Sequence, residues 1–358
     1  MLKYPDPMKT EQETVAALAE LIEHVPIARL QNVAREAAIE DRGVDAVFDV
    51  DVADRHYRLV CEVKNDGHPR TARLAIDQLK HWSLTRPRAE LVFMAPYISE
   101  QARQLCVDAG VHYLDLYGNY RLALDNLFIE RSVADKPAVE RRDLKSLFKP
   151  KSARVLRWLL KAPDRPARLK EIAEGARVSL GQVHNVKEGL LDREWASTTA
   201  DGLVLTDADG LLDAWREAYE APGQSRRYYT IHHGDALLAK LKALMARDGE
   251  TPRLAMASYS AANWLAPYGR SETTYLYAWP DILSELEAAL SLTQTAKGAN
   301  VLVTVLDDEG VLLDAVRPAP QIVTTSPVQT YLDLNDSGDR GREAAEFLRH
   351  QELQWPRP

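Results

Sequence analysis

Two carboxylates and a lysine in the first third of the chain have the types and spacing to bind a metal ion and activate water. Glu62 and Lys64 are separated by one residue, and Asp45 precedes them. Side chains two residues apart in a β-strand point to the same face of the sheet. Carboxylate oxygens are ligands that Mg²⁺ prefers, and a neighbouring lysine can stabilise charge or help activate water. The pattern predicts a site with Asp45 and Glu62 as metal ligands and Lys64 as the assisting cation.

Helices and strands alternate around these three residues. The pattern of apolar residues predicts a helix over 10–25, strands over 46–52 and 57–63, a helix over 70–85, a strand over 91–95, a helix over 99–109 and a strand over 113–116. This alternation is typical of an α/β sandwich around a central sheet. Asp45 precedes the strand next to that of Glu62, so we expect the three side chains to converge.

The same residues resemble the PD-(D/E)xK restriction-endonuclease-like superfamily over about residues 10–130. Gln78-Leu79-Lys80-His81-Trp82 is similar to its accessory Gln-x-x-x-aromatic motif, and Glu13 or Glu20 could supply a further acid. The first acid stands in Gly43-Val44-Asp45, without the proline of the superfamily's name. The resemblance implies catalytic roles for Asp45, Glu62, Lys64 and Gln78 only if the domain cleaves DNA, because this fold also serves simply to bind DNA. Taken alone, Glu62 and Lys64 are also consistent with an exposed ion pair at a strand edge.

A strongly basic block follows in a chain that is acidic as a whole. Between Lys136 and Lys170 there are twelve Lys or Arg residues and three acids, a net charge of about +9, although the whole chain has a net charge of −8. A concentrated positive surface attracts a polyanion, and phosphate contacts supply much of the affinity in DNA binding. The alternative is a solvated, charge-rich linker.

A winged helix-turn-helix is predicted within and after this block. The first helix, capped by Ser152, has its apolar residues at Val155, Leu156, Leu159 and Leu160, which places Arg154, Arg157 and Lys161 on outer positions. A short helix over 169–173 follows, and a third helix begins at Ser179 with Gln182 as its capping-box partner. Strands 196–199 and 203–205 form the wing around Asp201-Gly202. The alternative is a small helical interaction module of the same shape.

The third helix would be the recognition helix, whose first turns meet base edges in the major groove. Asn and Gln can bind adenine through two hydrogen bonds, while Ser and His can contact phosphate or base. The predicted DNA-binding residues are Ser179, Gln182, His184, Asn185, Lys187, Arg154, Arg157, Lys161, Arg168, Lys170, Thr198 and Thr199.

Composition is that of a multi-domain globular protein. A length of 358 residues predicts two or three domains, here 1–135, 136–220 and 221–358. No apolar run approaches the ~18 residues of a membrane span, and the first residues lack the apolar core of a signal peptide. Cys61 and Cys106 are too few for a disulfide framework or a zinc site, so we expect buried thiols in a reducing compartment, the cytoplasm.

The remaining segments resemble a known family of regulators. Five stretches carry this resemblance: Tyr113–Leu122, Lys297–Val301, Ser326–Leu334, Gly338–Gly341 and Glu343–Leu348. The most specific part is Gln329-Thr330-Tyr331-Leu332-Asp333-Leu334. Together with the winged helix they are similar to the AbiEi-type antitoxins of type IV toxin–antitoxin systems, in a long form with an endonuclease-like N-terminal domain. The resemblance implies a DNA-binding transcriptional regulator and a toxin as a possible protein partner.

The last third of the chain predicts a mixed α/β domain. Helices are expected over 235–247, 260–265, 282–290 and 340–350, and strands over 254–257, 274–278, 300–306 and 321–324. The β-prone run 301–306 is expected in the interior of the sheet, followed by a solvated acidic turn at 307–310. Asp333 is expected to cap or pair, and His232-His233 to lie at the surface. Dimerisation, partner contact and additional DNA contact all remain open as tasks for this domain.

Two functions of different classes follow from these patterns. The favoured one is a non-catalytic regulator that binds double-stranded DNA through the winged helix as a homodimer on a two-fold or repeated site, needs no cofactor and contacts no membrane. The endonuclease-like domain would then be a second DNA-binding surface. The alternative is a Mg²⁺-dependent nuclease that the winged helix targets, which requires Asp45, Glu62 and Lys64 to converge in an open cleft. A purely protein-binding antitoxin with a vestigial winged helix is the third possibility.

Overall fold

The computed structural model describes residues 7–35, 43–84, 88–134, 137–247, 249, 251–269 and 271–355. Lys136, the first residue of the basic block, lies outside this range. The chain divides into two compact units, one of residues 1–141 with 191–194 and the other of residues 142–190 with 195–358. None of the described helices combines the length and apolar character needed to cross a membrane.

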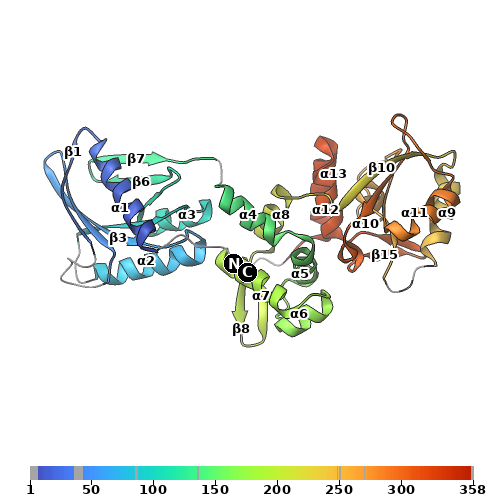
Figure 1. Cartoon of the computed structure of the whole chain (residues 1–358), viewed down its shortest axis with the longest axis horizontal. Helices are drawn as coiled ribbons and strands as arrows, with labels where there is room; N and C mark the ends of the chain where they lie inside the picture. The colour runs from blue at the N-terminus through green and yellow to red at the C-terminus, as the bar shows by residue number, and fades with distance from the viewer. Residues whose placement is uncertain are drawn as a thin grey trace. The chain divides into compact units, whose positions relative to one another are not determined.

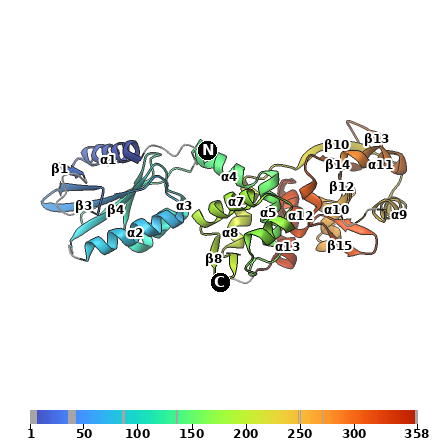
Figure 2. The same cartoon turned by 60° about the horizontal axis from the view of Figure 1, so that its bottom comes forward.

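The first unit is a sheet covered by helices on both faces (Figures 1 and 2). Its seven strands lie in chain order, and β3, β4 and β5 are mutually parallel while the other neighbours are antiparallel. The strands are β1 (Ala28–Arg35), β2 (Ala46–Val52), β3 (Arg55–Val63), β4 (Ala89–Ala95), β5 (His112–Asp115), β6 (Tyr120–Leu124) and β7 (Leu127–Arg131). The prediction of a mixed α/β fold with these central strands is confirmed, but it missed β1, β6 and β7.

Burial explains the layers of this unit. Helix α1 (Pro7–Glu23) places Val15, Leu18 and Ile22 on one face of the sheet. Helices α2 (Pro69–Ser83) and α3 (Glu100–Ala109) cover the opposite face with small and aliphatic side chains such as Ala75 and Leu79. Strands covered on both faces need apolar residues at successive positions, as in Val60-Cys61 of β3, where both side chains are fully buried.

The second unit begins with a helical module. Its elements are α4 (Ala138–Leu147), which starts in the first unit, then α5 (Pro150–Leu160), α6 (Leu169–Gly175), α7 (Leu180–Asp192), the hairpin β8 (Ala196–Thr199) and β9 (Gly202–Leu205), and α8 (Ala208–Glu217). The predicted helices and hairpin are present. Gly202 has φ of +140°, and an added Cβ would lie 2.3 Å from the carbonyl oxygen of Ala167, so the hairpin requires glycine there.

Ser152 does not cap a helix, contrary to the prediction. Helix α5 begins two residues earlier, at Pro150, with Lys149 as its N-cap residue. Ser152 is buried, and its hydroxyl donates a hydrogen bond to the Ser146 carbonyl. Proline at the first position of a helix is favoured because its missing N–H would have no partner there.

A second seven-stranded sheet forms the rest of this unit, in the order β13-β10-β14-β12-β11-β16-β15. The strands are β10 (Gly223–Tyr229), β11 (Leu254–Met256), β12 (Thr274–Ala278), β13 (Thr293–Gln294), β14 (Val301–Leu306), β15 (Val316–Ala319) and β16 (Ile322–Thr324). The helices are α9 (Gly234–Met245), α10 (Ser258–Leu265), α11 (Leu283–Leu290), α12 (Pro327–Asn335) and α13 (Gly338–Glu352), with 3₁₀ turns η2 (Pro280–Ile282) and η3 (Glu309–Leu312). The apolar run 301–306 forms β14, which lies between β10 and β12 in the interior of the sheet, as predicted.

The acidic turn after β14 differs from its prediction. Asp308 is the N-cap residue of η3, and its Oδ1 accepts a hydrogen bond from the Gly310 N–H. Asp308 also pairs with Arg154 of α5. The segment is therefore a contact of the C-terminal region with the helical module, where a solvated hairpin turn was expected.

Candidate functional site

The predicted endonuclease-like residues come together at one end of β3. Lys64 Nζ donates hydrogen bonds to Glu62 Oε1 and, at 3.3 Å, to Gln78 Oε1 on α2. Asp45 Oδ2 accepts a hydrogen bond of 2.6 Å from the backbone N–H of Val63. Gln78 Nε2 donates to the carbonyl of Gly43, two residues before Asp45. Asp45, Glu62, Lys64 and Gln78 thus form one connected cluster, as their order in the sequence predicted.

Glu62 is the buried member of this cluster. It is only 2% exposed, and burial, opposed by the ion pair with Lys64, raises its pKa to about 7. Its second oxygen, Oε2, has no hydrogen-bond partner among the described residues. The simple alternative of an exposed ion pair is wrong, because a carboxylate this deeply buried loses most of its hydration.

The cluster has two carboxylates and no third. No group of three or more His, Cys, Asp or Glu side chains suited to a metal ion occurs in the described parts of the chain. Glu13 and Glu20, the possible extra acids, are exposed on α1. A divalent cation could therefore find Asp45 and the unpartnered oxygen of Glu62 here, and would need backbone or water oxygens for its other ligands.

The second candidate surface is the helical module of the other unit. Val183, Val186 and Leu190 of α7 are buried, as predicted from their spacing. His184 and Asn185 are exposed on this helix, Lys187 is partly exposed, and Ser179 is exposed directly before it. Ser179 Oγ accepts a hydrogen bond from the Gln182 N–H, which is one half of the predicted capping box, while the Gln182 side chain bonds to Ser152 instead. On the other elements of the module, the exposed predicted residues are Lys161, Arg168, Lys170, Thr198 and Thr199.

Three predicted DNA contacts are used inside the protein instead. Arg157 is 4% exposed and donates hydrogen bonds to Gln329 Oε1 at 3.1 Å and to the Gly310 carbonyl at 3.2 Å. Arg154 donates two hydrogen bonds to the Asp308 carboxylate, from Nε to Oδ1 and from Nη2 to Oδ2. Gln182 Nε2 donates to Ser152 Oγ on α5 at 2.9 Å. The prediction that Arg154 and Arg157 face outward is wrong, because the C-terminal region packs on that side of α5.

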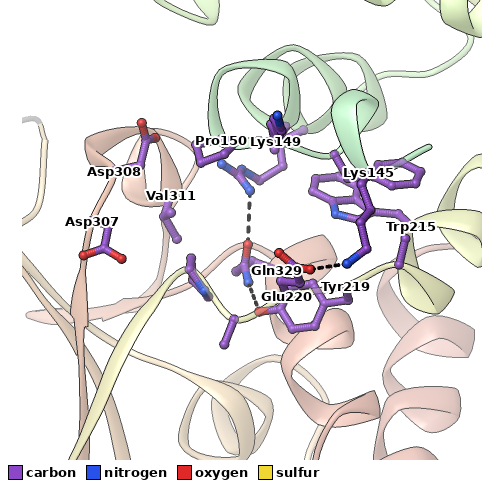
Figure 3. Close-up of a pocket in the computed structure, with 16 residues that line it drawn as sticks. Lys145, Lys149, Pro150, Trp215, Tyr219, Glu220, Asp307, Asp308, Val311 and Gln329 are labelled. Carbon is purple, nitrogen blue, oxygen red and sulfur yellow. Dashed lines mark hydrogen bonds and ion pairs between the residues drawn. The ribbon is translucent and has the colours of Figure 1, made fainter. Parts of the chain in front are cut away.

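Figure 3 shows the pocket where α5 faces the C-terminal region. The pocket has a volume of about 180 Å³. Phe148 and Trp215 stack with ring centroids 5.6 Å apart, and the Arg157 guanidinium lies 5.8 Å from the Trp215 ring. Gln329 lies between Arg157 and Tyr219 and hydrogen bonds to both, while Lys145 pairs with Glu220 at 2.7 Å. These contacts join the helical module to α12.

One residue that the sequence analysis did not select stands at the start of α7. Leu180 is 54% exposed, an unusual position for a leucine next to the exposed Ser179. Leu180 does not share the spacing of the buried Val183, Val186 and Leu190, and this difference in the sequence could have identified it as exposed. An exposed apolar side chain on a recognition helix can contact the methyl group of thymine.

Residues 204–354 match a family model described as transcriptional regulator, AbiEi antitoxin, Type IV TA system. Over these residues the chain is similar to the AbiEi family. The matched region starts within β9 and includes α8, the second sheet and all of its helices. It contains the Gln329–Leu334 stretch that carried the resemblance most specifically.

The other comparisons add little. A solved structure titled "Structure of EndoMS-dsDNA2 complex" is 21% identical over 32% of this chain and 48% of that chain, with a TM-score of 0.22. The match thus spans about half of that protein, and a likeness this low carries no argument about this chain. No curated protein matches.

Proposed function

We propose that this protein is a DNA-binding transcriptional regulator that binds duplex DNA through a winged helix formed by α5, α6, α7 and the β8–β9 hairpin. The main support for this proposal is that α7 buries Val183, Val186 and Leu190 while it exposes His184 and Asn185. A recognition helix needs this division, since one side must pack on the module and the other must meet the bases. The AbiEi family description, transcriptional regulator, supports the same function.

Phosphate contacts in this proposal come from exposed residues around α7. Lys161 follows α5, while Arg168 and Lys170 lie at the start of α6. Thr198 and Thr199 are exposed on the hairpin, in the position of a wing. Arg154, Arg157 and the Gln182 side chain are excluded because they are committed to contacts within the protein. A homodimer would present two such helices to a palindromic or repeated site.

The test begins by selecting preferred duplexes from a random pool with the full-length protein. Binding of the best sequence and of single-base variants is then measured by fluorescence anisotropy at several salt concentrations. We expect Asn185→Ala to lose ~1–3 kcal/mol of discrimination at one base pair, and Lys170→Ala to weaken all sequences and reduce the salt slope by ~1. Lys297→Ala, an exposed lysine in the C-terminal region, is the matched control. Wild-type behaviour of both test variants would refute the winged-helix assignment.

The Asp45–Glu62–Lys64–Gln78 cluster supports a second candidate, a Mg²⁺-dependent nuclease. Asp45 and Glu62 would hold the ion, which would supply Lewis-acid activation of water, and Lys64 would stabilise charge. Gln78 would keep Lys64 in place through their hydrogen bond. The burial of Glu62 and its pairing with Lys64 favour the regulator, in which this domain is a second DNA-binding surface, since a catalytic cluster must be accessible to DNA.

Incubation of labelled duplex with the protein and Mg²⁺ separates these two functions. Retarded but intact DNA, unchanged in Glu62→Ala/Lys64→Ala, is expected for the regulator. Cleavage that the double variant abolishes would make the protein an enzyme. Asp77→Ala, an exposed acid on α2, controls for an unspecific effect of removing charge from this unit.

The family description also extends the proposal to a protein partner, a toxin whose effect this protein counters. Co-expression of a neighbouring toxin gene with wild type and with Asn185→Ala tests this part. Growth rescue that survives the loss of DNA binding would support a protein-level role. Rescue lost together with DNA binding would place the antitoxin effect in gene regulation.

A further inference from the structure

A second cavity, of about 230 Å³, lies in the C-terminal part of the second unit. Tyr275 and Tyr277 of β12 and Thr304 of β14 line it from the sheet, and Tyr277 and Thr304 are direct neighbours across the two strands. Ser258 at the start of α10 and Asp333 of α12 line it from the helices. A single ordered water needs only ~10–15 Å³, so this cavity is large enough for a small organic ligand.

The cavity is acidic. Among the described residues that line it, the charged side chains are Asp333 and Asp336, with no Lys or Arg. Asp333 is 8% exposed. Its Oδ1 accepts hydrogen bonds from the hydroxyls of Tyr219 and Tyr277, each at 2.5 Å, and from Gln329 Nε2 at 2.9 Å. All three donors are neutral, so the carboxylate is held in place without a compensating positive charge, which is costly for a buried ion.

One polar atom of this cavity's walls lacks a partner, and a second is only weakly paired. Ser258 Oγ forms no hydrogen bond with the described residues, and Asp333 Oδ2 forms none of ordinary geometry, although the backbone N–H of Ser258 interacts with this carboxylate. Ser258 is 7% exposed, so its hydroxyl is largely removed from water. Buried polar atoms are nearly always paired, and exceptions call for a missing water or ligand.

The backbone at Ser258 is strained as well. Its φ is +47°, in the left-handed region that favours glycine, where the chain passes from β11 into α10. Such a conformation costs of order 1–3 kcal/mol in a residue other than glycine and is concentrated at ligand-binding and active sites. This observation is independent of the charge of the cavity and concerns the same wall.

We propose that this cavity binds a small organic cation, an alkylammonium or alkylguanidinium group. Asp333 is its counter-ion, the Ser258 hydroxyl accepts one of its hydrogen bonds, and the tyrosine side chains form its walls. Aromatic rings favour organic cations over neutral ligands of the same shape. A bare metal ion fits less well, because hard cations take six or more oxygen ligands and the described residues offer no group of three acidic, His or Cys ligands.

Asp333 is also connected to the helical module. Gln329 Nε2 donates to Asp333 Oδ1. Figure 3 shows the same side chain bonded to the Tyr219 hydroxyl through Nε2, and its Oε1 accepts from Arg157 of α5. Ser152, also on α5, accepts from Gln182 of α7. The hydrogen bonds from Asp333 therefore reach Arg157 of α5, and α5 separately contacts the proposed recognition helix through Ser152 and Gln182. Binding to the cavity itself does not depend on the proposed function and is measured without DNA.

The test is isothermal titration calorimetry of the full-length protein with n-butylammonium and n-butylguanidinium chloride. n-Butanol is the neutral control, and sodium chloride at equal concentration controls for ionic strength. We expect saturable binding of at least one cation and none of butanol. Asp333→Asn, which keeps the side-chain shape, should weaken binding at least tenfold, whereas Asp281→Asn, an exposed acid outside the cavity, should leave it unchanged.

Thr304→Lys is a second variant, needed in case Asp333→Asn fails to fold. It would place a positive charge in the cavity from the partly exposed β14 position, and we expect it to abolish binding. Circular dichroism and the unfolding midpoint establish that each variant is folded. Equal binding of butanol, no binding of either cation, or wild-type affinity in folded Thr304→Lys would each overturn the proposal.

Discussion

Arg154 and Asp308 form a two-pronged ion pair between α5 and η3, although they lie 154 positions apart in the chain. Arg154 Nε donates to Asp308 Oδ1 at 2.9 Å and Nη2 donates to Oδ2 at 2.7 Å. The pair is largely shielded from solvent, with side-chain exposures of 13% and 16%. Paired guanidinium–carboxylate hydrogen bonds add geometric specificity to their charge attraction. This contact fixes the helical module to the C-terminal region within the second unit.

A double-mutant cycle should measure a substantial coupling between these residues. Arg154→Ala and Asp308→Ala, alone and combined, are expected to show an interaction free energy of ~1–3 kcal/mol in urea unfolding. The exposed pair Arg247–Glu285, with side-chain exposures of 66% and 43%, is the control and should contribute less than ~1 kcal/mol. Equal coupling in both pairs would contradict the structural role of Arg154.

Arg157 should matter for stability because of its buried contacts. Arg157→Ala removes the partner of Gln329 and leaves Asp314, 3.6 Å from Arg157 Nε, without its nearest cation. Breaking a buried pair costs ~3–5 kcal/mol, so we expect a clear drop in the free energy of unfolding. Arg157→Lys should not restore it, because an ammonium cannot reproduce the forked geometry. Arg168→Ala, an exposed arginine, should change stability by less than ~0.5 kcal/mol.

The carboxyl of Glu62 should titrate near neutral pH in metal-free protein. Burial is the main cause that raises its pKa to about 7, the hydrogen bond from Lys64 lowers it, and the charge of Asp45 raises it. A side-chain ¹³C titration should therefore find a higher pKa in Lys64→Met and a lower one in Asp45→Asn. A shift in the same direction in both variants would contradict the geometry of the cluster.

The same pKa has a consequence for stability. The folded protein holds the Glu62 proton more tightly than the unfolded chain, whose value is about 4.5. The free energy of unfolding should therefore fall as pH rises from about 4.5 to about 7 and then level off. Glu62→Gln should remove this part of the pH dependence, which urea unfolding at a series of pH values can follow. An unchanged profile in the variant would show that other groups cause the fall.

Both thiols should be unreactive in the folded protein. Cys61 and Cys106 are fully buried, and burial raises the pKa of the Cys106 thiol to about 12 and that of Cys61 well above its usual range. The thiolate is the reactive form, so a disulfide reagent at pH 8 should label neither residue until urea is added. Rapid labelling of native protein would show that the first unit opens readily.

Local patterns were sufficient to predict most elements of this fold. The 3.6-residue spacing of Val183, Val186 and Leu190 predicted the buried side of α7, and the apolar run of β14 predicted an interior strand. Strand β1 was missed because Ala28 is its only buried residue and the adjacent Gln31 and Asn32 are both exposed, so its sequence has neither a continuous nor an alternating apolar pattern. The order of Asp45, Glu62, Lys64 and Gln78 also predicted one cluster correctly.

The sequence by itself determined these periodicities, because backbone geometry decides which residues of a helix or strand share a side. Only the tertiary structure decided what each side meets. Arg157 lies on the flank of an amphipathic helix, where solvent was expected, but Gln329, 172 positions away, covers it. Asp333 and Ser258 likewise become a cavity wall through the meeting of α10, α12 and the sheet. Such contacts depend on the packing of distant segments, and local spacing carries no information about them.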